Sequence, residues 1–258
     1  MSFLSLTGIE FTKIKRSKIL LILLAATVIL WIPSILNADL NFTMASHGIY
    51  IEPEYNFFIQ GFMGMAWFMF PGSMVVSTVM INQTERANNG ILKMLALPLS
   101  TIRLCLAKFA ALLVLAALQV IMMTGMYYLS AAIVSQAQAY DMILPLQYVF
   151  KEAGAIYLAA IPMLAFFWML SVCIRTPIFS IGIGLVSIVP SILAINTKAW
   201  FIYPMAYQFY IIVAEQGRLT ERLAASQIEI VPWIPVAAAI TMICLCISCL
   251  RFGQDERR

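Results

Sequence analysis

The sequence predicts an all-α, polytopic membrane protein with six transmembrane helices. Of the 258 residues, 62% are apolar and 11% are charged, whereas about 25% of a typical soluble domain is charged. The 16 basic and 12 acidic residues are also separated by long stretches without charge. A helix rises about 1.5 Å per residue, so about 20 residues cross a hydrocarbon core of about 30 Å. Charge-free stretches of that length exclude a water-soluble globule and a disordered chain.

The charged residues mark the ends of the spans, because a charge at the middle of the bilayer costs about 2.5–3.5 kcal/mol. The segment Phe3–Lys18, which precedes the first span, is weakly amphipathic, and we expect it to lie flat on the cytoplasmic leaflet. Its apolar face is predicted to hold Phe3, Leu4, Phe11 and Ile14. The six spans, which form a single transmembrane domain over residues 1–258, are placed at residues 19–36, 57–81, 109–134, 154–174, 177–195 and 231–250.

The charges in the loops predict that both termini are cytoplasmic. Twelve of the 16 basic residues lie before the first span, between the second and third, between the fourth and fifth, or after the sixth. The other four lie in the opposite loops, together with eight of the 12 acidic residues. Loops rich in lysine and arginine stay on the cytoplasmic side, and this rule fixes the orientation.

The run Ala199–Ala214, between the fifth and sixth spans, is apolar but short, and Pro204 interrupts it. As a seventh span it would put the basic C-terminal tail outside, against the positive-inside rule. We therefore expect an external helix that is re-entrant or interfacial, because the aromatic residues of the run suit the headgroup region. These residues are Trp200, Tyr203, Tyr207 and Tyr210. A partly buried external loop helix without a function of its own fits the run equally well.

The sequence lacks the catalytic residues that most enzyme classes require. His47 is the single histidine, so a two-histidine metal site cannot form. The cysteines lie outside the external loops and fit better as small apolar residues in helices than as metal ligands. The predicted spans contain no acidic residue and no histidine, which argues against an intramembrane protease and an ion-coupled transporter. We expect no catalytic residue, metal or cofactor in this chain. The five cysteines are Cys105, Cys173, Cys244, Cys246 and Cys249.

The connection Asn82–Lys108 is the most informative segment for function. Its first part is too polar for the bilayer core, and its second part is too apolar for an ordinary linker. Asn88 and Asn89 can cap a short helix, Asn88–Leu97, which Pro98 ends. Ser100 or Thr101 can then cap the long helix that becomes the third span.

The short helix carries more apolar side chains than it can bury against itself. It must rest on the headgroup region or dock into a groove of a cytoplasmic partner, and the residues alone leave both alternatives open. Its apolar residues are Ile91, Leu92, Met94, Leu95 and Leu97.

Several motifs lie in and around the connection Asn82–Lys108. A basic stretch precedes the first span, a Glu-Arg pair is followed by Asn-Gly, and the pattern Leu-x-x-Leu-x-Leu-Pro-Leu-Ser precedes the third span. In these features the chain resembles the type-two ABC exporter permeases. The stretches QTERANNGILK (residues 83–93) and QGFMGMAW (residues 60–67) are similar to the lantibiotic-immunity permeases of Gram-positive bacteria. The resemblance covers the whole chain in span number, spacing and orientation of the termini.

This resemblance implies the permease subunit of an ATP-driven exporter in a bacterial plasma membrane. It implies a cytoplasmic coupling helix between the second and third spans and an external re-entrant element between the fifth and sixth. The implied partners are a cytoplasmic ABC ATPase dimer with ATP and Mg, a second permease subunit, identical or related, membrane lipids, and an amphipathic antimicrobial peptide as substrate. No nucleic acid is expected. The implied ATPase-coupling residues are Glu85, Arg86, Asn89, Gly90, Ile91, Leu92, Leu95, Leu97 and Pro98.

The chain itself has no phosphate-binding loop, because none of its 12 glycines begins the pattern G-x-x-x-x-G-K-[ST]. We therefore expect ATP hydrolysis by a separate subunit and no enzyme activity in this chain. Two alternatives remain: an ion-coupled secondary transporter whose site is built from backbone carbonyls, and a membrane scaffold that transports nothing. An adjacent reading frame that encodes an ATPase with this loop would favour the exporter.

Overall fold

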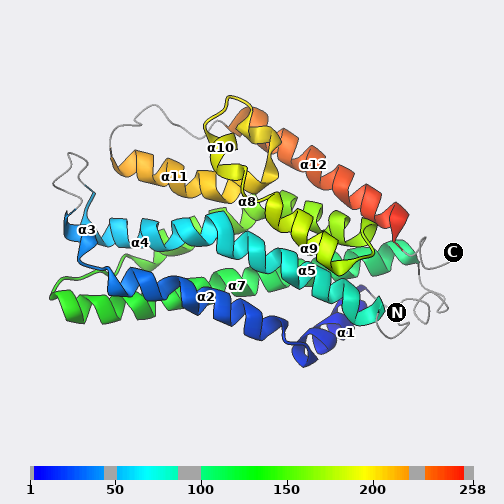
Figure 1. The fold of residues 1–258 in the computed structure, drawn as a ribbon, viewed down its shortest axis with the longest axis horizontal. Coiled ribbons are helices and arrows are strands. Elements are labelled where there is room, and N and C mark those ends of the chain that lie inside the picture. The colour runs from blue at the N-terminus through cyan, green and yellow to red at the C-terminus, as the bar shows by residue number, and fades with distance from the viewer. Residues whose placement is uncertain (1–2, 44–50, 87–99, 221–229, 253–258) are drawn as a thin grey trace.

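The structure, a computed structural model, describes residues 3–43, 51–86, 100–220 and 230–252. In these ranges every regular element is a helix, which confirms the all-α prediction. Six of the described helices are long and apolar enough to cross a membrane, so the predicted number of spans is also confirmed. Figure 1 shows them as an elongated bundle. They are Ile19–Leu36, Pro53–Gln83, Thr101–Gln138, Leu146–Cys173, Pro177–Ile195 and Pro232–Arg251.

Basic residues gather at one end of the bundle. Helix α1 (Phe3–Arg16), the first turns of α7 (Thr101–Gln138) and the last turn of α12 (Ile230–Arg251) all lie at this end (Figure 1). We name it the basic end, after Lys13 in α1 and Lys108 in α7. Its charge predicts that it faces the cytoplasm.

The second span is a continuous helical segment whose hydrogen bonding changes near its centre. Helix α4 (Pro53–Gly64) runs into a π-helical turn, η2 (Met65–Met69), and then into α5 (Phe70–Arg86). Pro71 explains the turn, because proline has no backbone N–H to donate and its ring clashes with the carbonyl four residues earlier. The helical segment is also longer than the predicted span 57–81.

Helix α2 (Ile19–Leu36) packs against this span through a buried tryptophan. Trp31 lies against Phe57 and Phe62, with ring centroids 5.6 and 6.3 Å apart. Gly61 lies directly against the Trp31 ring, because a Cβ added there would be 2.4 Å from the ring atom Cη2. The close approach of α2 and α4 therefore depends on glycine at this position. The short helix α3 (Leu40–Thr43) follows α2 at the opposite end of the bundle (Figure 1).

Helix α7 is longer than the predicted third span 109–134. Ser100 caps its first turn, because the Ser100 hydroxyl accepts a hydrogen bond from the Arg103 N–H at 3.4 Å, as the sequence predicts. The helix ends before Ala139, whose φ of 51° lies in the left-handed region. Its 38 residues rise about 57 Å, nearly twice what the hydrocarbon core requires.

Helix α8 (Leu146–Cys173) follows α7 through a short connection that Tyr127 fixes. The buried Tyr127 hydroxyl donates to the Met142 carbonyl and accepts from the Leu144 N–H, both at 3.1 Å. One side chain of α7 therefore satisfies two backbone groups of the connection.

The fifth span is interrupted. It consists of α9 (Pro177–Val186), a turn, and α10 (Ser191–Ile195). Two hydroxyl groups satisfy backbone carbonyls at the break: that of Ser187 donates to Gly184 at 2.7 Å, and that of Tyr203 donates to Ser187. Pro190 directly precedes α10 and is the local sequence signal of this break, because proline cannot donate a backbone hydrogen bond.

The run 199–214 is helical and belongs to the bundle. It forms η3 (Trp200–Ile202), η4 (Pro204–Ala206) and the first turns of α11 (Tyr207–Leu219). Helix α11 packs on α8 and α4, and its Gln208 is fully buried, with Nε2 donating to the Ala159 carbonyl at 3.4 Å. Whether this element is re-entrant, interfacial or a partly buried loop helix without a function of its own stays a prediction.

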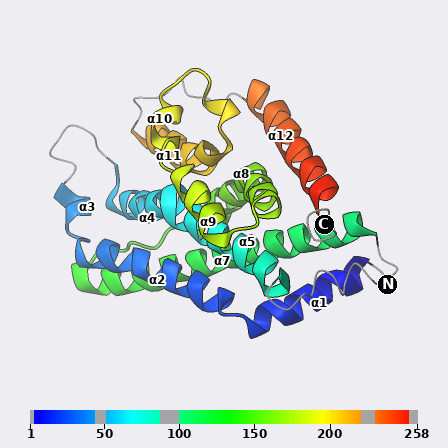
Figure 2. The same ribbon diagram turned by 45° about the vertical axis from the view of Figure 1, so that its right-hand side comes forward.

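Helix α12 lies on the flank of the bundle, packed mainly on α8 (Figure 2). Its outer side is apolar and open: Met242 is 64% and Leu250 is 68% exposed. Such a surface suits a helix whose surroundings are lipid or a second membrane subunit.

Candidate functional site

The structure places only part of the predicted coupling site. Glu85 and Arg86 lie in the last turn of α5. The helices on both sides of the coupling segment are described: α5 leads into it and α7 follows it. The other predicted coupling residues lie outside the described residues; they are Asn89, Gly90, Ile91, Leu92, Leu95, Leu97 and Pro98.

Asn82 fixes the end of α5 to the end of α8. Its Nδ2 donates to the Ser171 carbonyl at 2.7 Å and to the Ser171 hydroxyl at 3.1 Å. The Ser171 carbonyl is one of the last four of α8, which have no partner within their own helix. A side chain of the second span therefore caps the fourth span, just before the coupling segment begins.

A second contact at the basic end joins α7, α8 and the C-terminal segment. The indole Nε1 of Trp168, in α8, donates to the Cys105 sulfur, in α7, at 3.3 Å. The Trp168 ring lies 6.4 Å from the ring of Phe252, which directly follows α12. All three side chains are buried, so uncharged contacts join the helices at the basic end.

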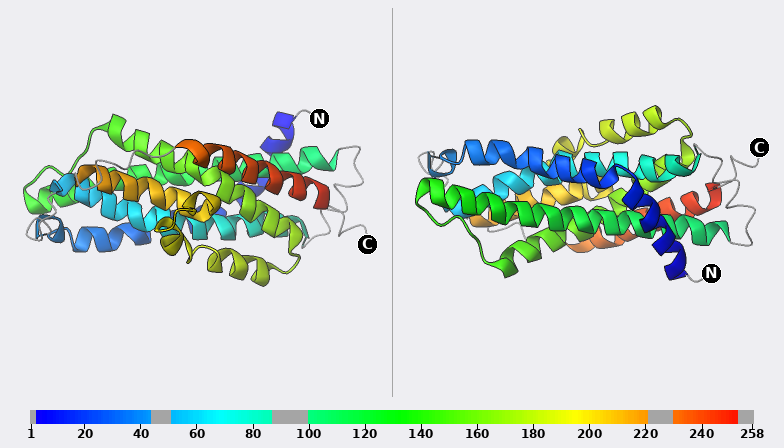
Figure 3. Two further views of the ribbon diagram at one scale, coloured as in Figure 1. Left: turned by 90° about the horizontal axis from the view of Figure 1, so that it is seen from above. Right: turned by 90° about the horizontal axis from the view of Figure 1, so that it is seen from below.

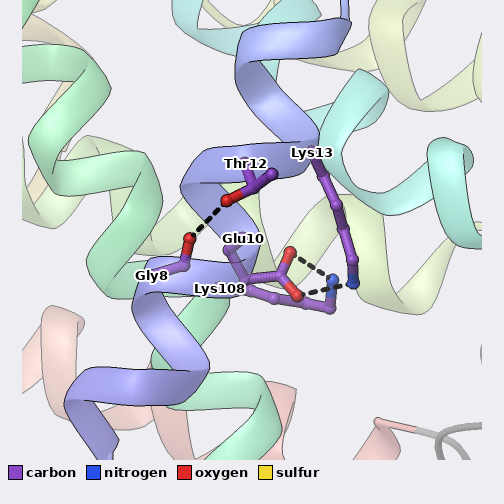
Figure 4. Close-up of polar contacts among 5 residues, drawn as sticks. All are labelled: Gly8, Glu10, Thr12, Lys13 and Lys108. Atoms are coloured by element: carbon purple, nitrogen blue, oxygen red, sulfur yellow. Dashed lines mark hydrogen bonds and ion pairs between the residues drawn. The ribbon is translucent and has the colours of Figure 1, made fainter.

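The third contact is an ion pair that joins α1 to α7 (Figure 4). Lys108 Nζ donates to Glu10 Oε2 at 3.0 Å, and Lys13 Nζ donates to Glu10 Oε1 at 2.9 Å. The Lys108 side chain is 0% exposed and that of Glu10 is 5% exposed, whereas that of Lys13 is 33% exposed. The link between the two helices is therefore buried, and the link within α1 is half-buried.

The charges of this group act on Glu10 in opposite directions. Burial raises the pKa of the Glu10 carboxyl, but the ammonium groups of Lys108 and Lys13 outweigh burial and hold the pKa below its ordinary value of 4.5. Glu10 is therefore ionised at neutral pH, and Lys108 retains an anionic partner.

The face of α1 that packs on the protein includes Ile14 of the predicted apolar face, whereas the side chains of Phe3 and Leu4 lie outside the described residues. The buried residues described on α1 are Leu6, Glu10 and Ile14, which are spaced four apart and share one side of the helix. Figure 3 shows α1 crossing α7 near the basic end. Ile14 was predicted on the apolar face, but the acidic Glu10 was not, because its partner lies 98 residues further along the chain.

An apolar groove lies away from the basic end, between α8, α11 and α12. Its volume is about 550 Å³. Among the described residues that line it, all are aliphatic or aromatic except Thr241. Tyr207 and Trp233 form an aromatic wall, with ring centroids 5.5 Å apart. The groove can hold a hydrocarbon chain or an apolar side-chain cluster, but it offers no charge to a ligand.

Helix α11 is fixed beside this groove by a polar cluster. The Tyr148 hydroxyl, in α8, donates to Glu215 Oε1 at 2.7 Å, and Arg218 Nε donates to Glu215 Oε2 at 2.8 Å. Burial raises the pKa of Glu215, but the hydrogen bonds from Arg218 and Tyr148 outweigh it and lower the pKa. The carboxylate is therefore held in its charged form between the two helices.

The contacts at the basic end left only weak signals in the sequence. Glu10 is the one acidic residue before Asp39, which marks it as unusual in a basic segment. Its spacing of four from Leu6 and Ile14 is the pattern of a single helix face.

Among the described residues, no group of three or more His, Cys, Asp or Glu side chains could hold a metal ion.

Comparison with known families assigns most of the chain. A family model described as ABC-2 family transporter protein matches residues 6–191, from α1 into α10. The match includes the connection between α5 and α7. A search of curated proteins found no match, and a search of solved structures found none either.

Proposed function

This chain belongs to the ABC-2 family of transporter proteins, and from this premise we propose that it is the permease subunit of an ATP-driven exporter. A separate cytoplasmic ATPase dimer supplies ATP hydrolysis with Mg, and a second permease subunit, identical or related, completes the membrane part. The proposed location is a bacterial plasma membrane. The proposed substrate is an amphipathic peptide antibiotic of the lantibiotic type.

The observation that carries the proposal is the fixing of both helices that flank segment 87–99. Asn82 ties α5 to α8 before the segment, and Lys108 ties α7 to α1 after it. A force applied to the segment is therefore passed to four helices, because neither flanking helix can move alone without breaking buried polar contacts.

In the proposed mechanism, closure of the ATPase dimer pushes on the predicted helix Asn88–Leu97. The push rocks the second, third and fifth spans and re-exposes the interior of the bundle to the outside. The break between α9 and α10 supports movement in the fifth span, because an interrupted helix can change its angle without breaking a continuous hydrogen-bond ladder.

The apolar groove supports an amphipathic substrate. Its lining can bury the apolar side of a peptide, and the aromatic wall of Tyr207 and Trp233 offers large contact area. Because the groove offers no charge, the polar side of such a peptide would stay in the headgroup region or in water. An immunity or resistance function follows if the peptide is removed from the membrane in this way.

The coupling proposal is tested by Leu92→Asp and Leu95→Asp. Each places a charge on the predicted docking face, and we expect the amount of co-purified ATPase and the export rate both to fall. Leu146→Asp is the matched control, because Leu146 is exposed at the start of α8, at the opposite end of the bundle. Unchanged co-purification and export in both test variants would reject segment 87–99 as the coupling site.

The energy source separates the exporter from the two alternatives. Dissipating the proton and sodium gradients with ATP intact should leave export unchanged. Loss of transport under that treatment would favour an ion-coupled transporter instead. A chain that moves no substrate under either condition would favour a scaffold.

The substrate proposal is tested with Trp233→Ala in cells that also express the partner ATPase. We expect resistance to lantibiotic peptides to fall at least severalfold, because the variant removes one side of the aromatic wall. Ile178→Ala is the control, because Ile178 is 79% exposed on α9 and does not line the groove. Wild-type cells whose susceptibility is unaltered across a peptide panel would remove the lantibiotic assignment.

A further inference from the structure

Helix α1 packs on the helix that follows segment 87–99 and lies beside a cavity that the helix before this segment also lines. On the α7 side, Lys108 forms the buried ion pair with Glu10. On the α5 side, Ile81 lines a small cavity together with Glu10, Lys13 and Ile14. Ile81 lies five residues before α5 ends at Arg86. One turn of α1 therefore contacts the helix that follows segment 87–99 and shares a small cavity with the helix that precedes it.

This packing is not that of a helix that merely rests on a lipid surface. Such a helix turns its apolar residues to the lipid and its charges to water. Here a carboxylate occupies the centre of the buried face, between Leu6 and Ile14. A lysine at the end of a span normally extends its ammonium group toward water, but Lys108 is fully buried beneath α1.

A buried ion pair is a costly way to hold two helices together, because both charges lose their hydration. Apolar residues of similar size would pack as tightly without that cost. What the ion pair adds is a defined position, because the ammonium and carboxylate groups meet in a single register. The pair therefore fixes where α1 lies on α7.

Helix α1 also leads directly into the first span. It ends at Arg16, and α2 begins at Ile19. The Ser17 hydroxyl donates to the Ile14 carbonyl at 2.7 Å and accepts from the Ile19 N–H at 3.4 Å, so one side chain links the end of α1 to the start of α2. A displacement of α1 is therefore transmitted to α2.

We propose that the Glu10–Lys108 ion pair is a positioning contact that makes α1, and through it α2, move with the coupling connection during the transport cycle. This inference rests on the proposed function, because it assigns a route for the force that the partner ATPase applies. It adds the first span to the spans that respond to the ATPase. Glu10 and Lys108 act through α1 and touch no substrate.

The test compares three variants of the purified permease–ATPase complex in lipid nanodiscs and liposomes. Lys108→Met removes the charge that links the helices and keeps most of the volume. Lys108→Arg keeps the charge. Lys13→Met is the matched control, because Lys13 pairs with the same carboxylate at nearly the same distance but lies on the same helix as Glu10. Two quantities are measured: amide hydrogen exchange of residues 3–16, and peptide exported per ATP hydrolysed.

We expect Lys108→Met to speed exchange in α1 at least about tenfold, because local opening follows the loss of the buried link. Exchange in the six spans, co-purification of the ATPase and the rate of ATP hydrolysis should stay near wild type. The peptide exported per ATP should fall severalfold. Lys108→Arg and Lys13→Met should resemble wild type in all of these measurements.

Three results would overturn the inference: unchanged exchange in α1, unchanged export per ATP despite faster exchange, or an equal loss of export in Lys13→Met. If Lys108→Met does not fold, Glu10→Gln combined with Lys108→Met removes both charges and is measured in the same way. The exchange measurement needs the permease alone, so it still reports the link between helices if no ATPase binds. Failure to bind an ATPase would instead reject the proposed function, and the coupling role with it.

Discussion

Replacing Gly61 by alanine should destabilise the bundle, although alanine is the better helix former. In an open helix the change would stabilise by about 0.5–1 kcal/mol. Here the added Cβ would lie 2.4 and 2.5 Å from two atoms of the Trp31 ring, well inside van der Waals contact. Overpacking of this kind costs about 1–3 kcal/mol.

The Trp31 ring has little room to move away from the new methyl group. It is 0% exposed, and the rings of Phe57, Phe62 and Tyr127 lie within 6.3 Å of it, centroid to centroid. The cost should therefore lie near the upper end of the range, which leaves a net destabilisation of about 2 kcal/mol after the helix-forming gain.

The assay is the fraction of detergent-solubilised protein that stays monodisperse after heating. Gly61→Ala should lower the midpoint temperature by several degrees. Gly125→Ala, where an added Cβ has nothing within 4 Å, should leave the midpoint unchanged or raise it. In a Trp31→Leu background the same Gly61→Ala change should no longer be harmful, because the ring that it meets is gone.

Two outcomes would refute this reasoning. A Gly61→Ala protein as stable as Gly125→Ala would mean that α2 and α4 are not in the close contact described. A Gly61→Ala penalty that persists in the Trp31→Leu background would mean that the ring is not its cause.

Two further predictions concern the basic end. Asn82→Ala should destabilise the folded protein by about 1–2 kcal/mol, because the last turn of α8 loses both hydrogen bonds from Asn82. Its neighbour Gln83 is half-buried, and Gln83→Ala should change the stability little. Thermal stability measures both variants, and equal effects would contradict the capping role of Asn82. The pKa of Glu10 is lowered in the folded protein. The stabilisation of α1 docking by the Glu10 carboxylate is therefore complete above pH 4.5, its ordinary pKa, and is lost as the pH falls through the lower pKa of the folded protein. A spin label at Lys15→Cys should therefore gain mobility on acidification, and at a higher pH in Lys108→Met; a pH-independent signal would contradict the role of the ion pair.

The number of spans was predictable from the sequence because a charge in the bilayer is costly in free energy. That constraint is local: each charged residue marks a span end without reference to the rest of the fold. The cap of α7 was predictable for the same reason, since Ser100 and the Arg103 N–H that it binds are three residues apart. The structure differs from the prediction where distant residues meet.

The docking of α1 is the clearest case of a feature that the sequence alone conceals. A pattern of apolar residues selects Phe11 and Ile14 and rejects Glu10, because an acid has no reason to be buried until its partner is known. That partner, Lys108, is brought to it by the return of the chain through two spans. The break in the fifth span is hidden only in part: Pro190 indicates an interruption locally, but Tyr203, which satisfies the Ser187 carbonyl, lies outside that span.

The interrupted fifth span has a consequence for how the chain is inserted during synthesis. The ten residues of α9 rise about 15 Å, so this helix alone covers half of the hydrocarbon core. When α9 leaves the ribosome, the Ser187 carbonyl at the break has no partner, because Tyr203 has not yet been synthesised. A backbone group without a partner is costly in lipid. The fifth span should therefore wait within the translocon, or against earlier helices, until the following residues arrive and complete it.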